Sequence, residues 1–140
     1  MLKINAADVV TEARSWIGTR WIHQGRSREG TDCFGLIVVT CREIGLPVED
    51  VEGYRRTPNP EMFISHAHKI FDPADAPAPG MVAIFKQARY PCHLGWFAER
   101  DGKLTVIHSF AGFRQVVEEP FDYHWPALLV ETRKIKGVTY

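Results

Sequence analysis

The sequence predicts an α+β fold, with helices near the amino end and then a mostly antiparallel sheet of about five to six strands. Apolar residues recur at helical spacing in the first third of the chain, whereas the segments after residue 80 resemble strands. Between two of those strands, Asp101-Gly102 is a strong signal for a tight hairpin, since both residues tolerate a positive φ. Helices followed by a run of strands are typical of this fold class.

Length and charge restrict the class of protein further. The chain has 140 residues, 45% of them hydrophobic, so we expect a single domain over residues 1–140. Its 17 Lys and Arg residues balance 17 Asp and Glu residues, which gives no sign of a nucleic-acid surface. The apolar runs are far shorter than the roughly 20 residues that span a bilayer, so we expect no membrane insertion.

The first helix is expected to begin after Asn5, which can cap it, with Asp8 in the opening turn. Gly18 is expected to end it. Its apolar face would consist of Val9, Val10, Ala13, Trp16 and Ile17.

The second helix follows the segment Gly30-Thr31-Asp32-Cys33-Phe34-Gly35-Leu36, and Gly45 followed by Pro47 is expected to stop it. Phe34, Ile37, Val38 and Cys41 form its apolar stripe. Cys33 therefore lies at the amino end, where unpaired N–H groups and the helix dipole favour a thiolate. We expect the pKa of this thiol to lie below its usual value of about 8.5.

The rest of the chain divides into loops and strands. Residues 19–31 form a polar loop around Trp21 and His23, and residues 47–80 hold six of the nine prolines, with one short helix expected between Glu61 and Ile70. Strands are expected at residues 81–85, 93–98, 104–108, 115–117 and 128–132.

Two histidines could serve Cys33 as partners. His93 opens one strand of the hairpin and His108 closes the other, so the simplest register places them side by side. A thiol hydrolase needs a helix-terminal cysteine, a histidine that takes and returns its proton, and a polar group that orients the imidazole. Cys33, His93 and His108 can fill these roles in that order.

Four motifs resemble the NlpC family of papain-like cell-wall cysteine peptidases, over about residues 6–130. They are Asp32-Cys33-Phe34-Gly35-Leu36, Pro79-Gly80 before an apolar strand, His93-Leu94-Gly95 and Ile107-His108-Ser109. The approach segment Trp21-Ile22-His23-Gln24-Gly25 is most similar to the branch encoded by bacteriophages, prophages and gene transfer agents beside tail genes.

The resemblance implies a papain-like fold with a catalytic Cys33, a general base His93 and a third residue His108. It also implies hydrolysis of peptidoglycan stem peptides, often next to the γ-linked D-glutamate, without a cofactor or a metal. Three positions depart from the family pattern: Phe34 replaces a frequent Ser, Trp21 replaces Tyr, and Met81 replaces Asp. The first two changes are expected to alter contacts with the substrate.

Four residues are candidates for substrate binding. The Cys33 N–H could stabilise an oxyanion together with a donor from the preceding loop, for which His23 and Gln24 are candidates. Trp21 could line a cleft for a sugar or a peptide. Asp32 could cap the nucleophile helix, bind a substrate ammonium group, or do both.

A zinc site is the main rival use of the same residues, because Cys and His are natural zinc ligands. It would draw on Cys33, Cys41, Cys92, His93 and His108. Helix geometry disfavours it, since Cys33 and Cys41 would lie about 12 Å apart along one helix. The remaining histidines, His66, His68 and His124, are expected at the surface.

Two other classes of protein remain open. One is a catalytically inactive structural or assembly protein of a phage tail tip, and the other is a papain-like amidase or acyltransferase. Asp8 interrupts what would be a signal peptide, and three cysteines without a CxxC pair suit a reducing compartment. We therefore expect synthesis in the cytoplasm. The resemblance to the phage-encoded branch implies transport to the cell wall on a phage tail, with stem peptides and tail-tip proteins as partners.

Overall fold

The computed structural model describes residues 3–56, 59–87 and 90–140. Its helices are α1 (Ala6–Arg14), α2 (Cys33–Glu43), α3 (Pro60–Ile70), α4 (Trp125–Leu128) and the 3-10 turn η1 (Ala111–Phe113). Its strands are β1 (Ile4–Asn5), β2 (Arg26–Ser27), β3 (Gly30–Thr31), β4 (Asp72–Pro73), β5 (Val82–Gln87), β6 (Tyr90–Arg100), β7 (Lys103–Phe110), β8 (Gln115–Pro120), β9 (Leu129–Lys134) and β10 (Val138–Thr139).

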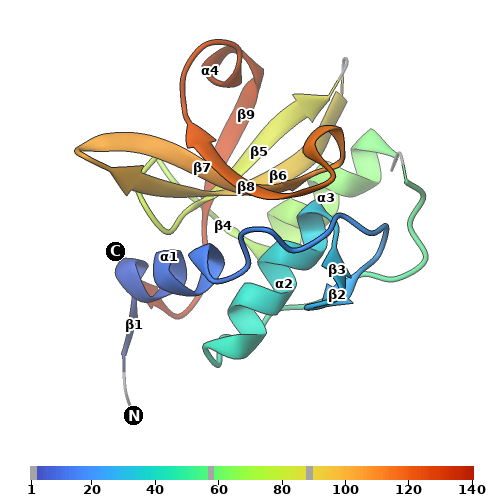
Figure 1. The fold of residues 1–140 in the computed structure, drawn as a ribbon, viewed down its shortest axis with the longest axis horizontal. Helices are drawn as coiled ribbons and strands as arrows, with labels where there is room; N and C mark the ends of the chain where they lie inside the picture. The colour runs from blue at the N-terminus through green and yellow to red at the C-terminus, as the bar shows by residue number, and fades with distance from the viewer. Residues whose placement is uncertain (1–2, 57–58, 88–89) are drawn as a thin grey trace.

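A six-stranded sheet with the order β4-β9-β5-β6-β7-β8 organises the fold, and every neighbouring pair in it is antiparallel (Figure 1). This confirms the predicted α+β class. Two smaller pairings complete the structure: β2 with β3, and a parallel pair of β1 with β10 that joins the two ends of the chain. Neither β4 nor the short pairs were predicted, because two-residue strands carry no periodicity in the sequence.

The β6–β7 hairpin has the predicted turn. Arg100 pairs with Lys103, and the two residues between them have positive φ, 52° at Asp101 and 78° at Gly102. Trp96 pairs with Ile107, as the simplest register requires. The turn therefore fixes which side chains of β6 and β7 share a face.

Helix α1 begins as predicted but ends early. Asn5 and Asp8 form a reciprocal capping box at its start. The helix stops at Arg14, and the chain then tightens into a turn so that the N–H of Gly18 can donate to the carbonyl of Val116 in β8, 2.9 Å away. Ile17, expected on the apolar face, is 43% exposed for this reason.

Helices and sheet form two apolar layers. Residues of α1, α2 and α3 pack on one face of the sheet, with Leu36, Ile37 and Trp96 among the buried side chains. The other face carries a smaller cluster that includes Phe85, Phe97 and Trp125 of the short helix α4, which lies opposite α1 and α2 in Figure 1. His93 and Phe97 are four positions apart on β6, and side chains an even number of positions apart share a face, so His93 belongs to this second face.

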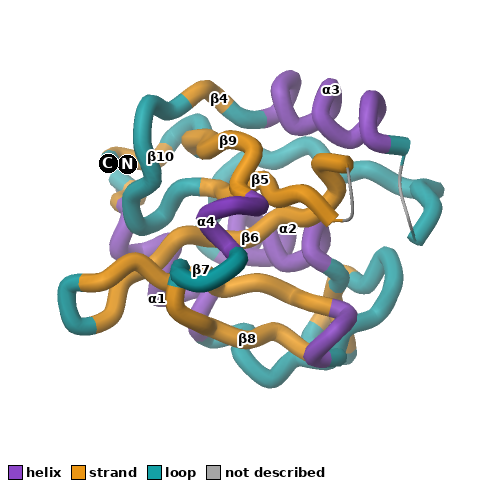
Figure 2. The backbone as a smooth tube through the Cα atoms, turned by 90° about the horizontal axis from the view of Figure 1, so that it is seen from above, coloured by secondary structure: helices purple, strands orange, loops and turns teal. Residues whose placement is uncertain are grey.

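The segment between α2 and the sheet contains the expected short helix. Asn59 caps α3, Pro60 occupies its first turn, and the helix runs to Ile70 above the edge of the sheet (Figure 2). No helix in the described part of the chain is long and apolar enough to cross a membrane.

Candidate active site

Cys33 is the first residue of helix α2. The Asp32 side chain caps the helix by accepting the N–H of Gly35 at 2.8 Å, as predicted. A Cβ atom at Gly35 would lie 2.2 Å from the carbonyl oxygen of Gly25, so the approach loop can pack on the first helical turn only where there is no side chain. The cap requires Asp at position 32, and the close packing of the loop requires Gly at position 35.

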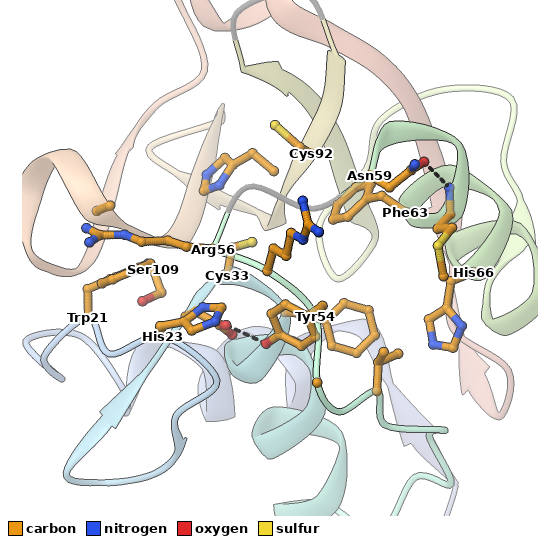
Figure 3. Close-up of a pocket in the computed structure, with 18 residues that line it drawn as sticks. Trp21, His23, Cys33, Tyr54, Arg56, Asn59, Phe63, His66, Cys92 and Ser109 are labelled. Atoms are coloured by element: carbon orange, nitrogen blue, oxygen red, sulfur yellow. Dashed lines mark hydrogen bonds between the residues drawn. The ribbon is translucent and has the colours of Figure 1, made fainter.

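A cavity of about 510 Å3 opens over Cys33 (Figure 3). It is lined by the approach loop, by the loop at residues 51–56, by helix α3 and by the start of β6. Cys33 and His93 both face it, as do Trp21, His23 and Asp32, whereas Gln24 does not line it.

The structure brings His93 and His108 together. His93 Nε2 lies 2.7 Å from His108 Nδ1, and the two side chains are nearly inaccessible to solvent, with residue exposures of 2% and 0%. Since Nε2 of His93 is engaged with His108, only Nδ1 could accept a proton from a thiol in the shared cavity. The N–H groups of Leu94, next to His93, and of Phe34 lower the pKa of the Cys33 thiol, which places the sulfur beside β6.

A fourth group extends this contact. His108 Nε2 lies 2.9 Å from Glu119 Oε2, and the indole N–H of Trp125 donates to Glu119 Oε1 at 2.5 Å. The sequence analysis missed Glu119, because the strand was expected to stop at Val117. Val117 pairs with His108, so the two side chains share a face of the sheet. Had the predicted strand been extended by two residues, its alternation would have placed Glu119 on that same face.

The Cys33 thiol is not pre-ionised, contrary to expectation. Burial and the neighbouring Asp32 carboxylate raise its pKa to about 12, against the opposing effect of the Leu94 and Phe34 N–H groups. The helix terminus was expected to dominate, but the low-dielectric surroundings disfavour the charged form more strongly. The Cys33 side chain therefore rests as a neutral thiol.

His93 is a neutral imidazole. Burial, together with the proximity of His108, holds the pKa of His93 well below 6.5. The imidazole is accordingly uncharged at pH 7 and can accept a proton. A neutral thiol beside a neutral imidazole suits transfer of the proton during attack on a substrate, rather than a preformed ion pair.

Asp32 is buried and its oxygens are fully engaged. It accepts the N–H groups of Gln24 and Gly35, each at 2.8 Å, the guanidinium of Arg26 at 3.1 Å, and the hydroxyl of Tyr54. A carboxylate offers about four acceptor positions, so a substrate ammonium would have to displace one of these donors. The ammonium contact stays a prediction.

Gln24 connects two loops. Its side-chain amide donates to the carbonyl of Tyr54 at 2.9 Å and its amide oxygen accepts the N–H of Gly53 at 3.3 Å. His23 remains at the cavity wall, edge-on to the Tyr54 ring at 5.5 Å. Of the two candidate oxyanion donors, only His23 lines the cavity.

The loop after α2 contributes site residues that the sequence analysis did not identify. Tyr54 closes over Asp32, and the guanidinium of Arg56 lies 4.7 Å from the Trp21 ring centroid.

His66, expected at the surface, is half-buried in the cavity wall, with its ring centroid 5.7 Å from that of Phe34. Its helix turns it inward, and burial lowers its pKa.

The rival zinc reading gains no support from these positions. Cys41 is buried in the core beneath α2 and does not line the cavity. Across residues 3–56, 59–87 and 90–140, no three Cys, His, Asp or Glu side chains are grouped so that they could hold a metal ion. His68 lies on the outside of the molecule, 2.6 Å from Glu131, and His124 is exposed, as expected.

Comparison with solved structures defines the class of fold. An NlpC/P60 family protein from Bacillus cereus matches 96% of the chain with a TM-score of 0.73 and 18% identity. A lipoprotein-like NLP/P60 family protein from Staphylococcus aureus matches 96% with a TM-score of 0.68 and 16% identity. The chain spans 41% and 43% of the lengths of these two proteins, respectively.

Smaller proteins match over their full length. The NlpC/p60 domain of the peptidoglycan hydrolase SagA aligns with 94% of the chain and 100% of its own, with a TM-score of 0.66 and 16% identity. An N-acetylmuramoyl-L-alanine amidase from Bacteroides uniformis aligns with 94% of the chain, with a TM-score of 0.60 and 11% identity. Searches against protein-family models and against curated proteins found no match. The chain therefore has the papain-like fold of NlpC/P60 proteins.

Proposed function

We propose that this protein is a cysteine hydrolase that cleaves an amide bond in peptidoglycan peptides. The supporting observation is the placement of Cys33 at the start of a buried helix, in one cavity with His93. The Nε2 atom of His93 contacts His108. The structural relatives include NlpC/P60 proteins, among them the NlpC/p60 domain of a peptidoglycan hydrolase. The finer assignment, a stem-peptide endopeptidase with a Cys33-His93-His108 triad, is part of this proposal.

In the proposed reaction, His93 accepts the thiol proton as the Cys33 sulfur attacks the scissile carbonyl carbon. The resulting oxyanion would be stabilised by the Cys33 N–H at the helix start and by a donor from the approach loop, for which His23 is the better placed candidate. His93 then gives the proton to the leaving amine, and a thioester on Cys33 remains. Water hydrolyses the thioester, with His93 again as base, and the thiol is restored.

The cavity suits a substrate with carboxylate groups. Arg55 and Arg56 stand at its rim, and His23 and His66 contribute imidazoles to the wall. The only acidic side chain that lines the described part of the cavity is Asp32, and it is already occupied by its own donors. Peptidoglycan stem peptides carry free carboxylates, so the charge of this rim favours them over a neutral lipid amide.

The test is digestion of purified muropeptides followed by mass spectrometry, with the wild-type protein and the Cys33→Ala variant in parallel. Cys41→Ala is the matched control, because it removes a cysteine outside the cavity. We expect a defined product from the wild type and from Cys41→Ala, and none from Cys33→Ala. Intact muropeptides with a folded wild type would contradict the proposal and favour the structural tail-tip protein.

The product also separates two hydrolases. A cut within the stem peptide identifies the endopeptidase, whereas release of the whole stem from the muramoyl lactyl group identifies the amidase. Amidase activity is a second candidate function because an N-acetylmuramoyl-L-alanine amidase from Bacteroides uniformis is among the structural relatives. It would leave the roles of Cys33 and His93 unchanged and change only the substrate contact.

We also propose that the protein reaches the cell wall on a phage tail or a related particle. This proposal is supported by the approach segment from Trp21 to Gly25 alone. None of the structures named above is described as a phage protein. Proteomics of purified particles tests this directly. The protein should copurify with intact tails at a fixed ratio, and its absence from them would overturn the proposal.

A further inference from the structure

We propose that Glu119 is a positioning residue that selects the tautomer of His93, acting through His108 and held in place by Trp125. The contacts form one chain, from the Trp125 indole to Glu119, then to His108, and from there to His93. The catalytic consequence rests on the proposed function, because it requires His93 to serve Cys33. The proton arrangement itself does not.

The distances determine where the protons can be. A carboxylate only accepts hydrogen bonds, so Glu119 Oε2, 2.9 Å from His108 Nε2, requires the His108 proton on Nε2. When Nε2 holds the single proton of His108, Nδ1 has a lone pair. Because His93 Nε2 lies 2.7 Å from that lone pair, His93 Nε2 must carry the proton and donate it. The lone pair of His93 is thereby left on Nδ1, which is the nitrogen that the proposed reaction needs as the acceptor of the Cys33 proton.

The reverse arrangement would stop the reaction. If His108 carried a proton on Nδ1, it would donate to His93 Nε2, and the proton of a neutral His93 would move to Nδ1. The imidazole would then present a donor, not an acceptor, to the thiol. Solvent has little access to either ring, since His93 and His108 are 2% and 0% exposed, so the protein contacts decide the tautomer.

Glu119 is well suited to act as a fixed acceptor. The bond from His108, which outweighs the opposing effect of burial, and the bond from Trp125 lower its pKa, so it is ionised at neutral pH. His124, in the same turn as Trp125, adds a favourable charge when protonated. The neighbouring Glu118 does not compete, because it points to the other side of β8 and pairs with Arg14 and Arg100.

The variant Glu119→Gln tests the tautomer. An amide has one oxygen, but two N–H donors, from His108 and Trp125, approach the two carboxylate oxygens. If the amide oxygen accepts from the indole, the NH2 group faces His108 Nε2 and forces the unproductive tautomer. We expect kcat to fall about 100-fold, as for loss of an outer hydrogen-bond partner of a functional histidine, with little change in KM.

The double variant Glu119→Gln/Trp125→Phe separates positioning from simple structural damage. Removal of the indole donor lets the amide turn its oxygen to His108 and restores the productive tautomer. We therefore expect the double variant to recover at least about tenfold in kcat over Glu119→Gln, although Trp125→Phe alone costs stability. A purely structural role for Glu119 predicts that the double variant is worse than either single one.

Two readouts need no substrate, so they distinguish failure of this inference from failure of the proposed function. Imidazole 15N NMR of the wild type should show His93 and His108 both protonated on Nε2, and Glu119→Gln should move both protons to Nδ1. The alkylation rate of Cys33, followed by mass spectrometry, should fall in Glu119→Gln and recover in the double variant. Glu118→Gln, on the same strand, should leave both readouts unchanged.

A wild-type spectrum with the proton of His93 on Nδ1 would overturn the inference even if the protein cleaves muropeptides. Unchanged tautomers and unchanged Cys33 alkylation in a folded Glu119→Gln variant would overturn it as well. Failure of the proposed function would look different: the tautomers and the alkylation rates would follow the expected pattern, while muropeptides remained intact.

Discussion

Replacement of Asp32 by Asn should destabilise the protein strongly, although it leaves the shape of the side chain unchanged. In the native structure, Oδ1 accepts from Gly35 and Arg26, and Oδ2 accepts from Gln24 and Tyr54. Whichever oxygen becomes an NH2 group will face two donors. The substitution also removes the only charge that Asp32 offers to the partly buried guanidinium of Arg26.

The expected loss is about 4 kcal/mol. Each buried group left without a partner costs about 1–3 kcal/mol, and breaking a buried ion pair by removing one partner costs about 3–5 kcal/mol. These terms overlap, since the guanidinium is counted in both. Against a total stability of about 5–15 kcal/mol, such a loss is large enough to be measured with certainty.

Urea unfolding followed by tryptophan fluorescence measures the free energy of unfolding directly. The matched control is Asp50→Asn, because Asp50 binds the same Arg26 at 3.1 Å but is more exposed than Asp32. We expect the control to lose about 1 kcal/mol or less. A loss below about 1 kcal/mol for Asp32→Asn, or one no larger than that of the control, would refute the reasoning.

The Asp32→Asn substitution should also change the reactivity of Cys33. The Asp32 carboxylate is one of the groups that raise the pKa of the thiol to about 12, after burial itself. Removing its charge should therefore lower that pKa and move the onset of Cys33 alkylation to lower pH. The expected protein is less stable and has a more reactive thiol.

Three further predictions concern other parts of the molecule. Burial would raise the pKa of Glu118, but its bonds to Arg14, Arg100 and Thr105 hold that pKa at about 2. The wild type should therefore lose the stability that ionised Glu118 contributes as the pH falls from about 5 to 2. Melting temperature followed against pH should show that Glu118→Gln lacks this contribution. Gly35→Ala places a Cβ 2.2 Å from the Gly25 carbonyl, so thermal melting should report a loss of about 1–3 kcal/mol or more. Arg56→Glu should raise KM for an acidic muropeptide about tenfold with kcat nearly unchanged, and an equal effect on a neutral peptide amide would argue against the charge of the rim.

Local signals in the sequence predicted the elements well. The cap at Asn5, the cap at Asp32 and the turn at Asp101-Gly102 all act within a few residues, and each is present in the structure. The register of that turn was sufficient to bring His93 and His108 together, because the pairing of two adjacent strands follows from the turn that connects them.

Features that depend on distant segments were not predictable in the same way. Tyr54 reaches Asp32 from a loop without hydrophobic periodicity, and Glu119 meets His108 from a strand that ends in residues that rarely form strands. The pKa of Cys33 was expected to fall because the helix terminus is visible in the sequence, whereas the burial that raises it appears only in the packed structure.

Trapping of the acyl-enzyme tests whether Cys33 is the nucleophile. A muropeptide substrate is mixed with the protein, the reaction is quenched in acid within one turnover, and the intact protein and its peptides are weighed by mass spectrometry. We predict a thioester on Cys33 with the mass of the acyl half of the substrate. It should decay when the substrate is removed and be absent from Cys33→Ala. Substrate consumption without an adduct on Cys33, or with equal turnover by Cys33→Ala, would contradict this prediction.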